Sequence, residues 1–200
     1  MKIILASKSP RRRRMFEELG IPHLLWDGDA DESRTKKAVE GLPPSDIVEA
    51  LAKCKAAGCF DDVRDEDCLI IGADTVVALG DKILGKPVDD EDAFNMLKSM
   101  SGSVHDVYSG ICAIYGGRSV TAYEKTEIKF REITDSEIRR YMATGEHRDK
   151  AGSYGIQEKG GYFVERVWGD INNVVGLPVL KLRNTVLESF GIDLFDPDNL

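Results

Sequence analysis

Short apolar runs alternate with amphipathic segments along the chain, and this alternation predicts an α/β protein. The first run, residues 3–6, reads Ile-Ile-Leu-Ala, which is typical of a short buried strand. Ser9 and Pro10 then favour the start of a helix, and Gly20 marks its end. The chain is therefore expected to begin as a strand, a turn and a helix.

The rest of the pattern predicts helices and strands that alternate, but not strictly. We expect helices at residues 44–57, 90–97, 135–143 and 178–191, and strands at residues 68–71, 75–79, 83–84, 104–108, 111–115 and 123–130, with a hairpin-like region at 162–168. A polar loop is expected at residues 27–37. Consecutive strands with no helix between them imply antiparallel pairs, so the predicted class is α/β around a mixed sheet.

Composition limits the type of protein. With 200 residues, 42% of them hydrophobic, and no Gly/Ser/Pro-rich linker, the chain is expected to form one domain over residues 1–200. The net charge of −8 argues against general binding to nucleic acid or to an anionic membrane. No stretch has the length of a membrane span or a signal-peptide core, so we expect a cytoplasmic protein. Its four cysteines lack paired metal-ligand spacing, and without a secretion signal they are expected to be reduced thiols and not disulfides.

Four consecutive arginines, residues 11–14, follow the predicted start of the first helix. A helix N-terminus already carries partial positive charge, so each exposed arginine adds repulsion of about 0.3–1 kcal/mol. An anion bound there would turn the repulsion into attraction, and Arg11 and Arg12 lie nearest to the helix start. The alternative is a solvated basic run with no ligand.

Asp74 lies between apolar, β-type residues in the stretch "LIIGADTVVAL". A carboxylate buried there costs several kcal/mol unless a cation or hydrogen-bond donors compensate. The partner is a lysine or a metal ion. The alternative is an aspartate that only stabilises a turn between two strands.

Three further charged residues are candidates for a polar site. Lys86 lies between Gly85 and Pro87 in "ILGKP", where its backbone has little freedom and its side chain is a point charge for phosphate. Lys55 is on the second predicted helix, where Lys53 fits the pattern equally well. Glu32 falls in the polar loop, where a solvated acid is the alternative.

The stretch "DKAGSYGIQEKGG", residues 149–161, has too many glycines for a regular element and predicts a shaped loop. Lys150 in it is a candidate phosphate ligand. Gln157 offers an amide that can both donate and accept, as recognition of a nucleobase edge requires. His105 is a candidate general base, but a single histidine in a strand is more often structural. Together, donors at a helix start, isolated lysines, a buried aspartate and an amide-bearing loop favour a phosphorylated substrate with a divalent cation. The chain lacks the Walker and dinucleotide-binding patterns, so neither a P-loop ATPase nor a Rossmann dehydrogenase fits.

Six motifs, in order, resemble the Maf family of nucleoside triphosphate pyrophosphatases: "LASKSPRR", "GADTVV", "ILGKP", "SGSVHDVYSG", "DKAGSYGIQ" and "NNVVGLP". The resemblance covers nearly the whole chain. It implies an elongated single α/β domain, with a mixed β-sheet flanked by helices and a substrate cleft between two lobes.

The resemblance also implies a reaction and a set of site residues. The family hydrolyses nucleoside triphosphates to the monophosphate and pyrophosphate with a divalent cation, Mg²⁺, Mn²⁺ or Co²⁺. Matched position by position, Asp74 is the proton acceptor and a metal contact, and Glu32 helps to hold the metal. Lys86 matches a basic cleft position near the phosphates, and we expect it to be the second catalytic residue. The expected substrate-binding residues are Ser7, Arg11, Arg12, Lys55, Thr75, Lys150 and Gln157, and among them Arg12, Thr75 and Gln157 match specificity positions.

The loop sequence "DKAGSYGIQ" resembles the branch that acts on dTTP, UTP and modified pyrimidine nucleotides as nucleotide-pool house-cleaning. A homodimer is expected. Two other functions stay open at this point. The chain is a nucleotide-responsive binding protein that inhibits septum formation through a cell-division partner, or the arginines bind nucleic acid, which the acidic net charge disfavours.

Overall fold

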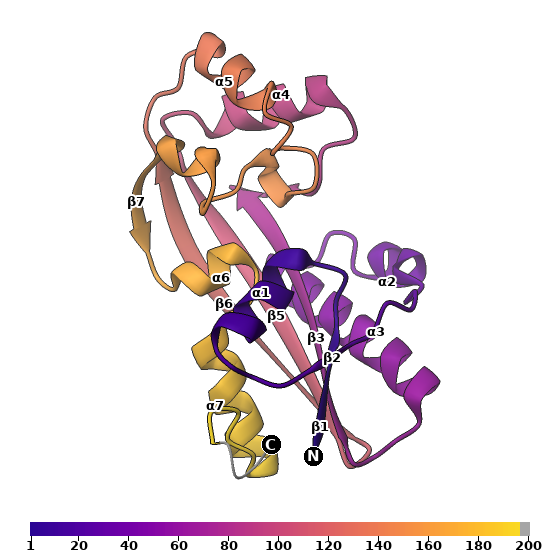
Figure 1. The fold of residues 1–200 in the computed structure, drawn as a ribbon. Helices are drawn as coiled ribbons and strands as arrows, with labels where there is room; N and C mark the ends of the chain where they lie inside the picture. Colours follow the sequence, from indigo (N-terminus) through magenta and orange to yellow (C-terminus); the bar gives the residue numbers. More distant parts are fainter. Residues whose placement is uncertain (197–200) are drawn as a thin grey trace. The chain divides into compact units, whose positions relative to one another are not determined.

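A computed structural model describes residues 1–196 of the chain, and its helices and strands are drawn in Figure 1. The helices are α1 (Pro10–Glu18), α2 (Glu32–Ala38), α3 (Pro44–Val63), α4 (Asp90–Met100), α5 (Asp135–Met142), α6 (Ile171–Val175) and α7 (Val179–Phe190). The strands are β1 (Lys2–Ala6), β2 (Leu24–Leu25), β3 (Cys68–Leu79), β4 (Lys82–Leu84), β5 (Val104–Tyr115), β6 (Arg118–Phe130) and β7 (Val164–Trp168). Two short 3₁₀ segments, Ala151–Ser153 and Lys159–Phe163, precede β7.

The strands of residues 1–196 form one seven-stranded sheet in the order β2-β1-β3-β5-β6-β7, with β4 paired to β3. Strand β1 pairs in parallel with both β2 and β3, whereas β3 with β4 and β6 with β7 are antiparallel pairs. The sheet is therefore mixed, and the predicted α/β class is confirmed.

Several predicted boundaries are wrong. The expected polar loop contains α2, and the expected runs 68–71 and 75–79 are parts of one strand, β3. The glycine between them does not make a turn, because a Cβ atom at Gly72 would lie 2.3 Å from the carbonyl oxygen of Ala52 on α3. The runs 104–108 and 111–115 likewise join as β5, where a Cβ atom at Gly110 would meet the α3 backbone at 2.4 Å. These two glycines allow close packing of a helix on the sheet.

The described chain divides into two compact units. Unit 1 contains Met1–Asp74, Ser109–Glu124 and the chain from Gly176 onward, and unit 2 contains Thr75–Tyr108 and Lys125–Val175. Strands β3, β5 and β6 each have residues in both units. The expected single domain and its cleft between two lobes stay predictions.

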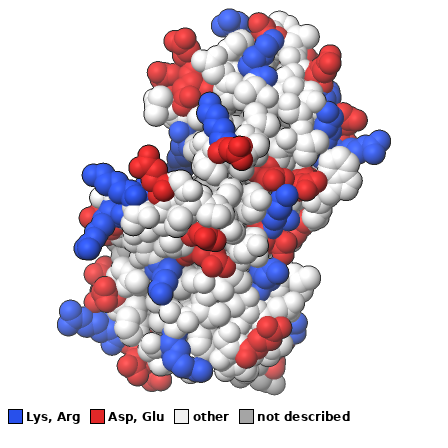
Figure 2. Space-filling view, turned by 180° about the vertical axis from the view of Figure 1, so that it is seen from behind, with Lys and Arg blue, Asp and Glu red and all other residues white. Residues whose placement is uncertain are grey.

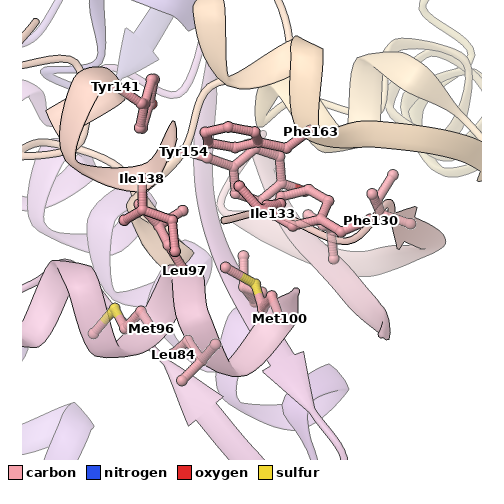
Figure 3. Packing of buried hydrophobic residues seen from close by; sticks show 13 residues of the cluster. Leu84, Met96, Leu97, Met100, Phe130, Ile133, Ile138, Tyr141, Tyr154 and Phe163 are labelled. Atoms are coloured by element: carbon pink, nitrogen blue, oxygen red, sulfur yellow. The ribbon is translucent and has the colours of Figure 1, made fainter. Parts of the chain in front are cut away.

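Each unit has its own hydrophobic core. In unit 1, Ile4 and Ala6 of β1 pack with Ala52 and Ala56 of α3. In unit 2, Tyr154 lies among aromatic and aliphatic side chains in Figure 3, with its ring centroid 4.7 Å from that of Phe130. The two clusters share no residue.

Strand β1 in unit 1 is covered on both faces. Ile4 and Ala6 face α3, and the alternate residues Ile3 and Leu5 are also buried. Figure 1 shows α2 and α3 together on one side of β1, and α1 and α7 on the other. The chain leaves β1 through α1 to reach β2 on one flank, and later returns through α2 and α3 to β3 on the opposite flank. The carboxyl end of β1 is therefore a topological switch point, where open α/β sheets bind ligands.

Candidate functional site

Three segments of unit 1 meet at this switch point. Strand β1 ends at Ala6, which pairs with Gly72 of β3. Ser7 follows β1, and Ala73 and Asp74 continue β3 beyond the residues that pair with β1. The predicted site residues Ser7 and Asp74 thus extend from neighbouring parallel strands at the same edge.

The N-terminus of α1 faces this edge through a short turn. The N-cap residue is Ser9, but its side chain makes no capping hydrogen bond, and the first turn contains no acidic residue. The backbone amide of Ser9 donates instead to Ser7 Oγ at 3.3 Å. Backbone N–H groups at a helix start attract anions, so the start of α1 has the chemistry that an anionic group prefers.

Arg12 is buried and bonded to the protein itself. Its Nη1 donates to Ser7 Oγ at 3.1 Å and to the carbonyl oxygen of Ala73 at 3.0 Å, and its Nε donates to the carbonyl oxygen of Gly176 at 2.7 Å. Burial lowers the pKa of Arg12, Asp74 opposes that shift, and the neighbouring Arg11 adds to it. The guanidinium therefore connects three segments: Ser7 after β1, Ala73 in β3, and Gly176 before α7.

Lys55 lies between two carboxylates of unit 1. Its Nζ is 2.5 Å from Asp74 Oδ1 and 3.5 Å from Glu32 Oε1, and it also donates to the carbonyl oxygen of Ala73 at 3.4 Å. The side chains of Lys55 and Asp74 are only 17% and 16% exposed, so water screens this attraction incompletely. The structure therefore brings together three predicted site residues from α2, α3 and β3.

Local sequence explains this arrangement. Asp31 caps α2 by accepting from the backbone amide of Ser33 at 3.1 Å, which fixes Glu32 at the first helical position. The absent side chain at Gly72 allows α3 to approach β3 closely, so Lys55 reaches Asp74. The prediction left Lys53 and Lys55 equivalent, and the structure has Lys53 exposed. Gly72 and the carbonyl of Gly176 were missed as positions that shape this cluster, because neither contributes a reactive side chain.

The donor chemistry of this cluster fits a hard divalent cation. Burial raises the pKa of Glu32, but the positive charges of Lys55 and Lys36 outweigh that effect and hold the pKa below its usual value. Within residues 1–196 no group of three or more His, Cys, Asp or Glu side chains could hold a metal ion. Two carboxylates are nevertheless sufficient where substrate phosphates complete the coordination, as is common for Mg²⁺.

The other predicted site residues belong to unit 2. Thr75 follows Asp74 on β3 and is half-buried, whereas Lys86 and Gln157 are exposed. Lys150 is buried, with its Nζ 2.6 Å from the carbonyl oxygen of Glu146. The backbone of Gly152 donates to the carbonyl oxygen of Gly85 at 3.0 Å, which joins the glycine-rich loop to the residue before Lys86.

His105 is structural, as its position in a strand suggested. It is 1% exposed, and its Nε2 lies 2.8 Å from the hydroxyl of Tyr154 in the core of unit 2. Burial lowers the pKa of His105 to about 4. A neutral imidazole within this core has no access to a substrate.

A family model described as "Maf-like protein" matches residues 2–189. The chain belongs to the Maf family. Among its curated relatives is the "dTTP/UTP pyrophosphatase" of Bacillus thuringiensis subsp. konkukian, which is 43% identical over 96% of this chain and 97% of its own length. A protein of Bacillus anthracis with the same name has the same identity and coverage. The resemblance carried by the six motifs is thus confirmed at the level of the Maf family.

A more distant likeness is to the structure of the Ham1 protein of Staphylococcus aureus. The identity is 12% and the TM-score is 0.44, over 65% of this chain and 72% of that one. At this TM-score the likeness supports no conclusion about the Maf-family chain.

No helix within residues 1–196 is long and apolar enough to cross a membrane. On the face shown in Figure 2, basic and acidic side chains are interspersed, with no continuous basic stripe. An extended basic footprint for nucleic acid is therefore not seen on that face.

Proposed function

We propose that this Maf-family chain is a nucleoside triphosphate pyrophosphatase that converts dTTP, UTP and modified pyrimidine nucleotides to the monophosphate and pyrophosphate. The observation that carries the proposal is the position of the Lys55 ammonium, which lies between Asp74 and Glu32 at the topological switch point. The names of the relatives at 43% identity support the same reaction.

The substrate's phosphates bind at the end of β1. The backbone amides at the start of α1 and the side chains of Ser7 and Arg11 would contact the polyanion, and Lys55 would add a further positive charge. Arg12 holds the surrounding backbone through its bonds to Ala73 and Gly176, and its positive charge adds to the attraction for phosphates. This arrangement recognises charge shared by all nucleoside triphosphates.

Glu32 and Asp74 are the residues that would hold a divalent cation, Mg²⁺, Mn²⁺ or Co²⁺. When bound, the cation neutralises phosphate charge and polarises the bond to be broken. In the protein without substrate, Lys55 provides the positive charge between the same two carboxylates.

Asp74 orients a water molecule and accepts its proton as the water attacks the α-phosphorus. Pyrophosphate leaves as the bond between the α-phosphorus and its bridging oxygen breaks. Lys55 contacts Asp74 Oδ1, which fixes the carboxylate orientation and leaves its second oxygen for the water. Positioning and charge account for the catalysis, with no covalent enzyme intermediate.

Three further residues, Thr75, Lys86 and Gln157, are assigned to nucleotide recognition from the family resemblance. Thr75 and Gln157 carry hydroxyl and amide groups that can hydrogen-bond to a base or a sugar, and Lys86 adds a positive charge for the phosphates. The exposed position of Gln157 in a turn makes its amide accessible to a ligand. Homodimer formation and a cell-division partner stay predictions from the family resemblance.

The test is a panel of canonical and modified nucleoside triphosphates incubated with Mg²⁺, Mn²⁺ or Co²⁺, with pyrophosphate and orthophosphate measured separately. The proposal predicts pyrophosphate release, highest with dTTP or UTP, and no turnover after chelation with EDTA. Release of orthophosphate with formation of the diphosphate would refute the proposed bond cleavage. Tight binding of nucleotide without turnover would favour a nucleotide-responsive binding protein.

A further inference from the structure

Lys150 is a buried lysine in unit 2, and its contacts argue against phosphate binding. Its side chain is 7% exposed, which is unusual for an ammonium group that must meet a ligand from solvent. It begins the glycine-rich loop that carries Gln157. The contacts of its side chain lie within this loop and the residues just before it.

The ammonium of Lys150 has a protein acceptor for each of its three hydrogens. Its Nζ donates to the carbonyl oxygen of Glu146 at 2.6 Å and to Asp149 Oδ1 at 3.0 Å, and it lies 3.2 Å from Glu158 Oε2. A lysine ammonium has three donors and no acceptor, so this set uses its full capacity. A phosphate oxygen would have to displace one of these partners.

The same side chain touches both ends of the turn that presents Gln157. The backbone amide of Glu158 donates to the carbonyl oxygen of Gly155 at 3.3 Å, which closes a four-residue turn with Ile156 and Gln157 at its centre. Lys150 forms its ion pair with Glu158 at one end. At the other end its stem packs against Gly155, where an added Cβ atom would lie only 2.6 Å from Lys150 Cε.

The base of this loop is held separately from the turn. Tyr154 lies in the aromatic cluster of Figure 3 and is bonded to His105. Glu146 accepts from the backbone amide of Lys159 at 3.0 Å, in addition to its carbonyl bond with Lys150. Loss of the Lys150 ammonium would therefore loosen the turn around Gln157 without removing the loop from the core.

We propose that Lys150 is a positioning residue for nucleotide selection: it fixes the turn 155–158 so that the Gln157 amide meets the base, and it does not bind phosphate. The inference rests on the proposed function through the role of Gln157. Lys150→Met keeps the apolar stem but leaves Asp149 and Glu158 without their shared cation, so like charges at the loop repel each other.

The experiment compares wild type, Lys150→Met, Gln157→Ala and the double variant, with Lys159→Met as the control for loss of an exposed lysine from the same loop. We expect Lys150→Met to lower the ratio of kcat/KM for UTP over GTP by roughly tenfold. Gln157→Ala should add little further loss in the double variant, since both changes remove the same contact. Inhibition by inorganic pyrophosphate, which has phosphates but no base, should not change.

A uniform loss for every nucleotide, with weaker inhibition by pyrophosphate and an unchanged UTP/GTP ratio, would instead make Lys150 a phosphate ligand and overturn the inference. So would full additivity of the two substitutions on the ratio. If Lys150→Met does not fold, Glu158→Ala is the second variant. It removes the same ion pair through Glu158, whose side chain is 40% exposed, and it should lower the same UTP/GTP ratio. An unchanged ratio would again overturn the inference.

Amide hydrogen exchange separates this inference from the proposed function. Faster exchange at residues 155–160 in Lys150→Met, but not in Lys159→Met, is expected whether or not nucleotides are hydrolysed. If wild type releases no pyrophosphate, the proposed function fails while the positioning of the turn is still measured. Unchanged exchange at these residues would contradict the positioning role itself.

Discussion

Lys55 and Lys150 are both largely buried lysines, one in each unit, and each is surrounded by oxygen atoms. The difference lies in where their partners come from. The carboxylates around Lys55 belong to α2 and β3, whereas those around Lys150 belong to its own loop.

Under the two proposals above, one side-chain type serves two purposes. A cation that joins separate elements at a switch point occupies a place that phosphates or a metal ion can share. A cation that closes one loop uses its hydrogen bonds to hold the backbone. The origin of its partners, more than its burial, distinguishes a candidate ligand from a structural support.

The largest expected effect is on the carboxylate beside Lys55. Asp74→Asn keeps the size of the side chain but removes the proton acceptor, and kcat should fall about 10²–10⁴-fold. Steady-state pyrophosphate release measures this, with thermal unfolding to confirm the fold and Asp29→Asn as a control on an exposed aspartate. Near-normal turnover of a folded Asp74→Asn protein would remove Asp74 from the mechanism.

The next effect tests Lys55 itself. Lys55→Met removes a hydrogen bond to a charged group worth about 1.5–3 kcal/mol, so kcat/KM should fall roughly 10–150-fold for every nucleotide. Pyrophosphate inhibition should weaken, in contrast to Lys150→Met. Lys53→Met, which alters an exposed lysine on the same helix, is the matched control. A larger loss from Lys53→Met would show that the wrong lysine was assigned.

A third experiment sharpens the contrast between charge and base recognition. Gln157→Ala should change the preference for UTP over GTP by an unsatisfied hydrogen bond, on the order of 1–3 kcal/mol. Lys86→Ala should weaken all triphosphates alike, because its contact would be with shared charge. Measuring kcat/KM of both variants on one nucleotide panel, at fixed metal concentration, distinguishes the two roles. The reverse outcome, with Lys86 setting base preference, would exchange the two roles.

The last experiment concerns the stability of the core that contains His105 and Tyr154, and not the candidate site. Burial lowers the pKa of His105 to about 4, so between pH 6.5 and pH 4 the unfolded chain holds a proton that the folded protein lacks. The associated stability is fully present above pH 6.5 and is lost as the pH falls toward 4. Between pH 7 and pH 5 this loss should be about 2 kcal/mol.

Urea unfolding of wild type and His105→Gln at both pH values measures that loss. The variant keeps a hydrogen-bonding side chain near Tyr154 but does not titrate, so its stability should fall less on acidification. Contributions from carboxylates are common to both proteins. Equal losses would mean that His105 is not the group responsible.

The mixed α/β class and the starts of α1 and α5 were predictable because apolar spacing and capping residues act locally; at α5, Thr134 and Glu137 form a capping box. The continuity of β3 was not, because Gly72 looks like a turn residue in sequence and only its packing against α3 shows otherwise. Helix α2 was missed because no residue in it is buried, so it shows no apolar periodicity.

The candidate site was predictable in part. Asp74 was a candidate because a carboxylate among apolar residues needs a partner, and the six motifs gave Lys55 and Glu32 as site residues. The structure brings these three residues together. Sequence could not show that the Lys150 ammonium is bonded within its own loop. A lysine in a glycine-rich loop has the same sequence pattern whether its ammonium contacts solvent or three protein oxygens. That distinction depends on contacts that form only on folding.

The most direct test of the central claim is hydrolysis of UTP in ¹⁸O-labelled water, with mass spectrometry of both products. Attack at the α-phosphorus by a water oriented by Asp74 predicts one ¹⁸O atom in UMP and none in pyrophosphate. Label in pyrophosphate or orthophosphate, with unlabelled nucleotide product, would place the attack at another phosphorus and contradict the account of this site.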